Sequence, residues 1–207
     1  MEVEWLRWAK RLHGIAATGL HFGSDEFDKE RYREVADIAQ AMLAALGVST
    51  IERIRDLVSE SARGYATPKI DVRGAVIDAG RILLVQERSD GLWTLPGGYA
   101  DVGRSPAENV TKEIWEEAGI RVAATALYGI RHKAKHEYTP DVRDFYKLFF
   151  LCTKTDRANP VAGGETCDVG WFEPKHLPAL SKGRCIEKDI RAAFAFAEDP
   201  RARAHFD

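Results

Sequence analysis

The sequence has few cysteines, no long apolar run and almost no net charge, and each shortage excludes a class of protein. Its 3 cysteines have no C-x-x-C spacing, which argues against a disulfide-stapled domain or a cysteine zinc site and favours reduced thiols in a cytoplasm. No apolar stretch approaches the roughly 20 residues of a membrane-spanning helix. The amphipathic first residues lack the apolar centre of a signal peptide. We therefore expect a cytoplasmic protein without a membrane segment.

The charge balance removes a broad electrostatic reason to bind nucleic acid. The chain has 30 basic and 32 acidic residues and a formal net charge of -2. Nonspecific binding to a phosphate backbone or an anionic membrane needs a basic surface, so any anionic small molecule must meet local charge. With 207 residues, 45% of them hydrophobic, the chain is long enough to bury a core.

The first part of the chain has the apolar spacing of helices. Apolar residues recur every three or four positions over residues 3–63, which predicts three helices. We expect Gly19 and Gly23 to separate the first two, and Ser49 with Glu52 to form a capping box for the third. So short a helical segment buries little by itself. It should pack on the rest of the chain or on a second copy, and we expect a homodimer.

From residue 67 the apolar pattern becomes alternating and β-rich, so we place a domain boundary near residue 66. A single long helix, residues 106–118, is inserted among the strands. This arrangement predicts a mixed α/β (α+β) domain over 67–207 with a mixed sheet between helices, preceded by a small all-α domain over 1–66. Strands are predicted at 72–78, 82–87, 126–131, 145–153 and 169–172, and a last helix at 184–197.

The segment from Leu95 to Ile120 is the most informative. Gly97 and Gly98 form a loop whose backbone can approach a ligand closely. Ser105 is a good N-cap, with Pro106 at the first helical position and Glu108 at the capping-box position. The next glycine after the apolar pattern, Gly119, suits a left-handed C-terminal cap.

Three glutamates of this helix lie on one face. Glu113, Glu116 and Glu117 are spaced i, i+3 and i+4, so their carboxylates can reach a common point. Their mutual repulsion would be relieved by a hard divalent cation, which prefers oxygen ligands. A solvated acidic face is the alternative for three glutamates alone. A separate apolar stripe can dock the helix on a sheet: Ala107, Val110, Ile114 and Ala118.

Together, the glycine loop and the glutamates resemble the signature of the Nudix hydrolases, in which Gly and Glu precede Arg-Glu-aliphatic-x-Glu-Glu-x-Gly-aliphatic. Two positions depart from it: Arg104 stands in place of the first Glu, and Lys112 in place of the Arg. Lysine supplies the charge of that arginine without its planar fork, and Glu108, one turn earlier, could pair with Lys112. The positions in register are Gly98, Glu113, Ile114, Glu116, Glu117, Gly119 and Ile120.

The resemblance implies the Nudix fold and hydrolysis of a diphosphate linkage. A Mg²⁺ or Mn²⁺ ion would be held by Glu113, Glu116, Glu117 and the carbonyl of Gly97, would lower the pKa of a bound water and would clamp phosphate oxygens. The general base stays open between a box glutamate, Glu116 or Glu117, and Glu165, which could equally be a solvated loop carboxylate.

Substrate phosphates also need cations from the protein. Arg73, Arg88 and Arg104 lie in or next to segments that should line the cleft, and Gly97 and Gly98 could bring backbone groups to the substrate. A further basic run at residues 131–136 favours a solvated strand end and loop over a phosphate site.

The first 66 residues resemble the helical extension of a bacterial Nudix subgroup associated with CDP-choline and ADP-ribose hydrolysis and with dimers. Two alternatives stay open: a house-cleaning nucleoside triphosphate pyrophosphohydrolase, and a regulatory module that only binds a nucleotide. Four aromatic residues of the extension could stack on a substrate or could belong to a core or interface: Trp5, Trp8, Phe22 and Tyr32.

Overall fold

The computed structural model describes residues 3–46, 50, 52, 54, 65–199 and 201–207. The chain divides into two compact units. The first comprises residues 1–69, 134–136 and 140–145, and the second comprises residues 70–133, 137–139 and 146–207. Each unit is described by itself.

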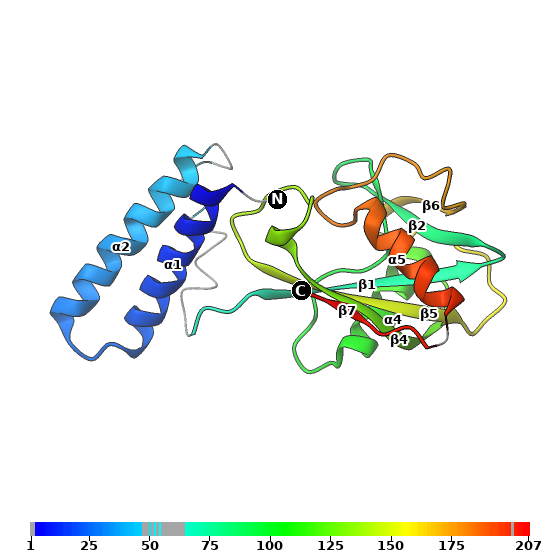
Figure 1. Cartoon of the computed structure of the whole chain (residues 1–207), viewed down its shortest axis with the longest axis horizontal. Coiled ribbons are helices and arrows are strands. Elements are labelled where there is room, and N and C mark those ends of the chain that lie inside the picture. Colours follow the sequence, from blue (N-terminus) through cyan, green and yellow to red (C-terminus); the bar gives the residue numbers. More distant parts are fainter. Residues whose placement is uncertain (1–2, 47–49, 51, 53, 55–64, 200) are drawn as a thin grey trace. The chain divides into compact units, whose positions relative to one another are not determined.

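The first unit is built on a helical pair, α1 (Glu4–Phe22) and α2 (Glu26–Ala45) (Figure 1). Asp25 caps α2 by accepting a hydrogen bond from the backbone N–H of Asp28 at 3.1 Å. The prediction that Gly19 separates the two helices is wrong, because Gly19 lies inside α1 and only Gly23 ends it. A Cβ at Gly19 would come within 2.4 Å of the Tyr32 ring. This glycine therefore serves the close packing of α2 on α1.

A small apolar cluster forms the core of this unit. Met42 and Ala44 pack against it, and Lys10 forms an ion pair with Asp144 at 2.7 Å. The third helix expected at residues 49–63 falls largely outside the described residues. The buried members of the cluster are Leu6, Ala9, Leu43, Ile54 and Val142.

The second unit contains a seven-stranded sheet in its described residues, with the order β3-β2-β1-β5-β4-β7 and with β6 paired to β2. The sheet is mixed, because β7 runs parallel to β4 whereas β2 is antiparallel to β1, β3 and β6. The strands are β1 (Lys69–Asp78), β2 (Arg81–Glu87), β3 (Trp93–Thr94), β4 (Val122–His132), β5 (Phe145–Lys154), β6 (Thr166–Phe172) and β7 (His205–Phe206).

A helix packs on each of two apolar clusters of this sheet. Helix α4 (Pro106–Ala118) contributes Val110, Ile114 and Ala118 to one cluster. Helix α5 (Glu187–Glu198) contributes Ile190 and Ala193 to the other. The predicted mixed sheet between helices is confirmed, and a helical segment precedes it as predicted, although the structure describes two of its three predicted helices, α1 and α2. Each strand predicted from residue 72 onward is present, with the same or wider bounds.

Two local expectations are wrong. The last helix begins at Glu187 and not at Arg184, which lies in the preceding loop. Arg131 does not lie at a solvated strand end, because it is 6% exposed and forms an ion pair with Asp189 at 2.9 Å.

The three cysteines are unpaired. No helix within the described parts of the chain is both long enough and apolar enough to cross a membrane.

Candidate active site

Helix α4 begins and ends as its sequence predicts. Ser105 accepts a hydrogen bond from the N–H of Glu108 at 3.2 Å, and the Glu108 carboxylate accepts one from the N–H of Ser105 at 2.7 Å. This is the capping box, with Pro106 in the first turn. Gly119 ends the helix with φ 67° and donates to the carbonyl of Trp115. Because Glu108 is used in the cap, the expected pair with Lys112 does not form.

Backbone hydrogen bonds join the glycine loop before α4 to strand β1. The N–H of Val72 donates to the carbonyl of Gly98 and the N–H of Gly74 donates to the carbonyl of Pro96, both at 2.9 Å. Gly97 has φ 144°, and a Cβ there would come within 2.0 Å of the Val72 carbonyl. Only glycine allows the chain to pass so close to β1 in this conformation.

Glu117 is the most buried of the three predicted metal ligands, with 5% of its surface exposed. Its Oε2 accepts a hydrogen bond from the N–H of Gly97 at 2.8 Å. Burial raises the pKa of Glu117 to about 8, while the nearby Arg73 guanidinium and the Gly97 hydrogen bond oppose that rise. The charges of Glu87 and Glu113 raise it further. A carboxylate this poorly solvated is ready to exchange its proton for a cation.

Glu113 approaches the glycine loop from one turn earlier. A Cβ at Gly98 would lie 2.8 Å from its Oε2, so Gly98 leaves room for this carboxylate. Burial raises the pKa of Glu113, Lys112 opposes the rise, and the charges of Glu116 and Glu165 add to it. Glu113, Glu117 and the glycine loop are thus brought together.

Glu116 is turned toward Lys112, whose Nζ lies 3.0 Å from Glu116 Oε2 and 3.8 Å from Glu113 Oε1. The same ammonium lies 3.2 Å from Asp101 in the loop. Hydrogen bonds to Glu116 and Asp101 raise the pKa of Lys112. Lys112 therefore braces the outer glutamates, although it stands where the signature has arginine.

Glu165 comes to the site on a loop that binds the end of α4. The N–H of Gly163 donates to the carbonyl of Glu117 at 3.1 Å, and the hydroxyl of Thr166 donates to the same carbonyl at 2.9 Å. A Cβ at Gly163 would come within 1.7 Å of the Glu116 carbonyl. The Glu165 side chain is exposed, yet its charge is among the causes that raise the pKa of Glu113.

Arg73 lies inside the protein and is 4% exposed. Its Nε and Nη2 donate to Asp71 at 2.9 and 3.1 Å, and its Nη1 donates to the carbonyl of Leu95 at 3.1 Å. Lys147 donates to the same Asp71 at 2.9 Å. Although burial acts to raise the pKa of Asp71, the two cations lower it to about 2. Arg73 is therefore bonded within the protein, and its charge opposes the rise in the pKa of Glu117.

The other two predicted phosphate-binding arginines are exposed. Arg88 donates to the carbonyl of Thr166 at 2.8 Å, which places it beside the loop of Glu165. Arg104 lies 4.0 Å from Asp101, on the outer side of the glycine loop. Arg104 can turn toward an anion at little cost, because an exposed ion pair contributes little.

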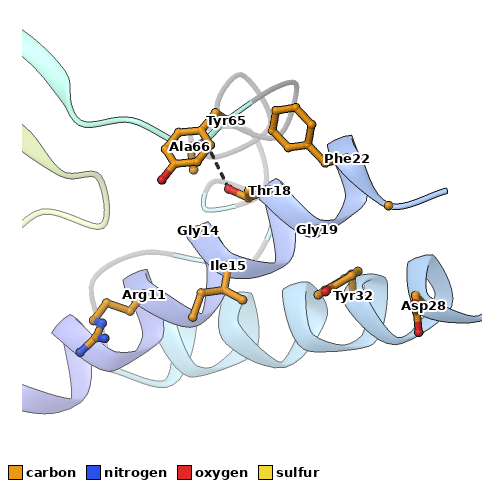
Figure 2. Close-up of a pocket in the computed structure, with 11 residues that line it drawn as sticks. Arg11, Gly14, Ile15, Thr18, Gly19, Phe22, Asp28, Tyr32, Tyr65 and Ala66 are labelled. Carbon is orange, nitrogen blue, oxygen red and sulfur yellow. Dashed lines mark hydrogen bonds between the residues drawn. The ribbon is translucent and has the colours of Figure 1, made fainter. Parts of the chain in front are cut away.

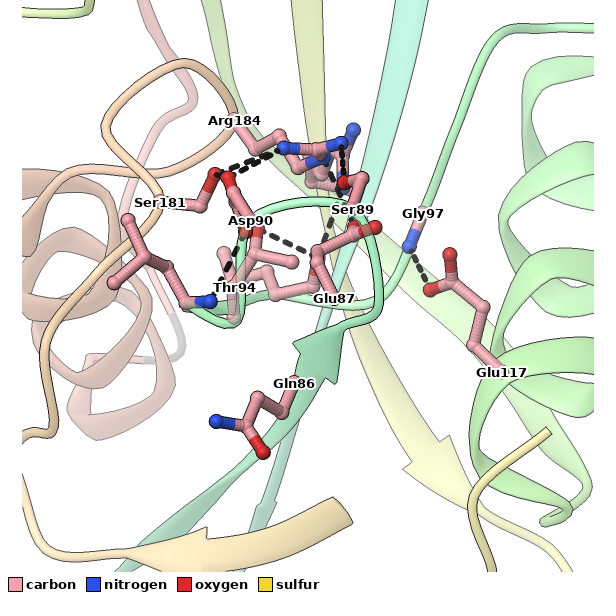
Figure 3. A network of polar contacts seen from close by, with 12 residues as sticks. Gln86, Glu87, Ser89, Asp90, Thr94, Gly97, Glu117, Ser181 and Arg184 are labelled. Carbon is pink, nitrogen blue, oxygen red and sulfur yellow. Dashed lines mark hydrogen bonds and ion pairs between the residues drawn. The ribbon is translucent and has the colours of Figure 1, made fainter. Parts of the chain in front are cut away.

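Two residues of the site were not predicted from the sequence. Glu87, at the end of β2, is 8% exposed and its Oε1 lies 3.0 Å from the Nε of Arg184. Figure 3 shows Arg184 at the centre of a network in which it also bonds to Asp90, Ser181 and Ser89 at 2.9 to 3.0 Å. No spacing relates these segments, because the fold alone brings the 181–184 loop to the end of β2.

The carboxylates fit a hard divalent cation by their chemistry. Within the described ranges, no three carboxylate, histidine or cysteine side chains converge closely enough to form a complete metal site as they stand. The donors are nevertheless all oxygen, the type that Mg²⁺ and Mn²⁺ prefer. Glu117 is buried with a raised pKa, and the absence of a side chain at Gly98 leaves room for the Glu113 carboxylate. A cation here would compete with Lys112 for Glu116.

The helical unit contains a pocket of about 650 Å³, lined by α1, by the first turns of α2 and by Tyr65 and Ala66 (Figure 2). The N–H of Ala66 donates to the Thr18 hydroxyl at 3.5 Å. Two of the four aromatic residues considered for stacking, Phe22 and Tyr32, line this pocket, together with Tyr65. The other two, Trp5 and Trp8, pack edge to face at 4.8 Å.

Two family descriptions match the chain. The NUDIX domain matches residues 68–193, and a UDP-X-like, N-terminal oligomerisation domain matches residues 3–58.

Individual relatives agree with both matches. YjhB of Bacillus subtilis (strain 168), which its name describes as a candidate ADP-ribose pyrophosphatase, is 40% identical over 207 residues, 100% of this chain and 99% of that protein. The crystal structure of an ADP-ribose pyrophosphatase from Streptococcus suis 89-1591 has a TM-score of 0.62 and 36% identity, covering 68% of this chain and 100% of that one. The crystal structure of a UDP-X diphosphatase has a TM-score of 0.64 and 28% identity, covering 99% of this chain and 98% of that one.

Proposed function

Because the chain belongs to the Nudix hydrolases, we propose that it cleaves the diphosphate linkage of a nucleoside diphosphate derivative, with ADP-ribose as the first candidate. Nudix hydrolases act on small nucleotide substrates and use divalent cations. The observation that carries the proposal is Glu117, buried, with a raised pKa and bonded to Gly97. The products would be AMP and ribose 5-phosphate.

The described residues would have separate roles in this reaction. Glu113, Glu116 and Glu117 would hold Mg²⁺ or Mn²⁺, with the Gly97 carbonyl as a further ligand. When bound, the cation would supply an activated water and neutralise charge on the phosphates. Lys112 holds Glu116 and Glu113 in place until the cation binds. Arg88 and Arg104, both exposed, would bind the phosphates, whereas Arg73 would act through Glu117 from inside.

Glu165 is the proposed general base. Its loop is tied to the end of α4 through Gly163 and Thr166, so the carboxylate stays near Glu113 while remaining exposed to water. A base needs access to the attacking water more than it needs burial. Glu116 and Glu117, as cation ligands, would have their oxygens occupied.

The comparisons support two different nucleosides in the substrate. The names of YjhB and of the Streptococcus suis protein favour ADP-ribose. One solved structure that is similar over nearly the whole chain is a UDP-X diphosphatase, which favours a UDP derivative as the second candidate. CDP-choline is the third substrate proposed, on the sequence resemblance alone.

Two further proposals concern the whole chain. A homodimer formed through residues 1–66 is supported by the match of residues 3–58 to an N-terminal oligomerisation domain. A cytoplasmic location is supported by the reduced state that the spacing of the cysteines favours.

The test is an assay with Mn²⁺ or Mg²⁺ on ADP-ribose, a UDP-sugar, CDP-choline and the common triphosphates, with Glu117→Gln as the inactive control. Release of a nucleoside monophosphate from a diphosphate derivative is expected. Pyrophosphate release from triphosphates would instead identify a triphosphate pyrophosphohydrolase. Nucleotide binding without turnover would identify a regulatory module.

A further inference from the structure

Arg184 binds the turn that follows β2 with all three nitrogens of its guanidinium group (Figure 3). Its Nε lies 3.0 Å from Glu87 Oε1, its Nη2 donates to the Ser89 hydroxyl at 3.0 Å, and its Nη1 donates to Asp90 Oδ2 at 2.9 Å. The same Nη1 donates to the Ser181 hydroxyl at 3.0 Å, and that hydroxyl donates to Asp90 at 2.7 Å. The planar fork of an arginine holds several acceptors in one fixed geometry. Arg184 therefore fixes the turn at three positions.

Arg88 lies between the residues that Arg184 binds, and it is joined to a further segment, residues 163–166. The N–H of Arg88 donates to the carbonyl of Glu165 at 3.2 Å, and its Nη2 donates to the carbonyl of Thr166 at 2.8 Å. The hydrogen bonds of Arg184 within the described part of the chain do not include this segment. Because Arg88 shares its backbone with the neighbours on either side that Arg184 holds, the connection from Arg184 to the Glu165 segment runs through Arg88.

The Glu165 segment is bonded in turn to the end of the catalytic helix. The Thr166 hydroxyl donates to the carbonyl of Glu117 at 2.9 Å, and the N–H of Gly163 lies 3.1 Å from the same carbonyl and 2.9 Å from the Thr166 hydroxyl. At Gly164 the segment faces open space, because a Cβ there would meet no atom within 4 Å. A segment with little packing around it depends on its hydrogen bonds for its position. The bonds from Arg88 and from α4 therefore decide where Glu165 lies.

We infer that Arg184 is a positioning residue of the active site: by fixing the turn on either side of Arg88, it orders both the Arg88 side chain and the Glu165 segment. It acts through these two residues and not on the substrate. The inference rests on the proposed function for the roles of Arg88 and Glu165, whereas the ordering of the segment does not depend on that function. Lysine cannot replace Arg184, because one ammonium group cannot bond to three separate residues of the turn in the geometry of the guanidinium.

The test combines hydrogen–deuterium exchange of the full-length protein with its kinetics on ADP-ribose and Mn²⁺, for wild type, Arg184→Gln and Arg184→Lys. In both variants the backbone amides of residues 86–91 and of residues 163–168 should exchange about tenfold faster than in wild type. The value of kcat should fall about tenfold or more, and KM should rise, because the base and the phosphate-binding side chain are both displaced. Arg191→Gln removes an exposed arginine of α5 and is the matched control, which should behave as wild type does.

The outcomes separate this inference from the proposed function. Faster exchange in residues 86–91 alone, or unchanged kcat and KM, overturns the inference, since Arg184 would then only stabilise its own turn. Recovery of wild-type exchange and kcat in Arg184→Lys also overturns it, because neutralisation of carboxylates would then suffice. If Arg184→Gln does not fold, Ser89→Ala removes one bond of the turn, and exchange in residues 163–168 decides in the same way. Faster exchange there in a protein whose wild type turns over no nucleotide supports the ordering by Arg184 and contradicts the proposed function instead.

Discussion

Replacement of Glu117 by glutamine should stabilise the protein at alkaline pH while abolishing its activity. The reason is the burial of Glu117, which raises its pKa to about 8 from an ordinary value of 4.5. In the unfolded chain this carboxyl ionises above pH 4.5, whereas in the folded protein it keeps its proton up to about pH 8. The folded state therefore binds more protons across that window, and its stability falls as the pH rises through it.

The size of the effect follows from the shift. Each pKa unit corresponds to about 1.4 kcal/mol, so the stability lost between pH 5.5 and pH 8 is about 3 kcal/mol. Glutamine keeps an oxygen that can accept the Gly97 hydrogen bond but has no proton to lose. The free energy of unfolding of Glu117→Gln, relative to wild type, should thus increase by about 3 kcal/mol over this range.

The assay is urea unfolding in EDTA at pH 5.5 and pH 8, with Glu173→Gln as a surface control. Saturating Mn²⁺ at pH 8 should then stabilise the wild type by about 3 kcal/mol at a hundredfold excess over Kd, and should leave Glu117→Gln unchanged. If the difference in unfolding free energy between Glu117→Gln and wild type were the same at both pH values, or if the variant were less stable than wild type at pH 8, the assignment of a buried, cation-ready carboxylate would be refuted.

Four other variants test separate parts of the account. Gly97→Ala should lower stability by more than about 2 kcal/mol and abolish turnover, because its Cβ would meet the Val72 carbonyl at 2.0 Å; thermal unfolding and activity measure both. Asp71→Asn should cost about 3–5 kcal/mol at pH 7 by leaving two buried cations without their carboxylate. Because folding lowers the pKa of Asp71 from 3.8 to about 2, its contribution is present above pH 4 and the difference from wild type should narrow in unfolding curves taken between pH 4 and pH 2. Ser105→Ala should cost about 1 kcal/mol in urea unfolding with KM unchanged, and a changed KM would contradict a purely capping role. Thr166→Val should lower the free energy of unfolding by about 1–2 kcal/mol. It should also reduce kcat with little change in KM, because the Thr166 hydroxyl bonds the Glu165 loop to α4. A kcat equal to that of wild type would argue against the general base lying on that loop.

The catalytic helix could be predicted residue by residue because its information is local. A serine cap, a proline at the first position, a glutamate at the capping-box position and a terminal glycine each satisfy backbone groups within a few residues. These interactions bound α4 at Pro106 and Ala118, as predicted. The five longer strands were predicted for the same reason, since their alternation is also local. The two-residue strands β3 and β7 were not predicted, because so short a segment shows no alternation.

The remaining site residues depend on contacts between distant segments, which no spacing encodes. Arg73 was predicted to bind a phosphate. In the fold its guanidinium instead donates hydrogen bonds to Asp71 and to the carbonyl of Leu95. The second contact joins segments that are distant in the sequence, so the sequence pattern does not predict it. Glu87 and Arg184 are nearly one hundred positions apart and meet at the end of β2. Gly19 was taken for a helix breaker, because the packing of Tyr32 against it is a tertiary contact.

The most direct test of the central claim is AMP release from ADP-ribose by the purified protein, followed with Mn²⁺ and then with EDTA, for wild type and for Glu117→Gln. We predict AMP and ribose 5-phosphate in equal amounts from the wild type with Mn²⁺, and none with EDTA or from the variant. Equal AMP release from Glu117→Gln, or release that persists in EDTA, would contradict a cation-dependent hydrolase centred on this glutamate.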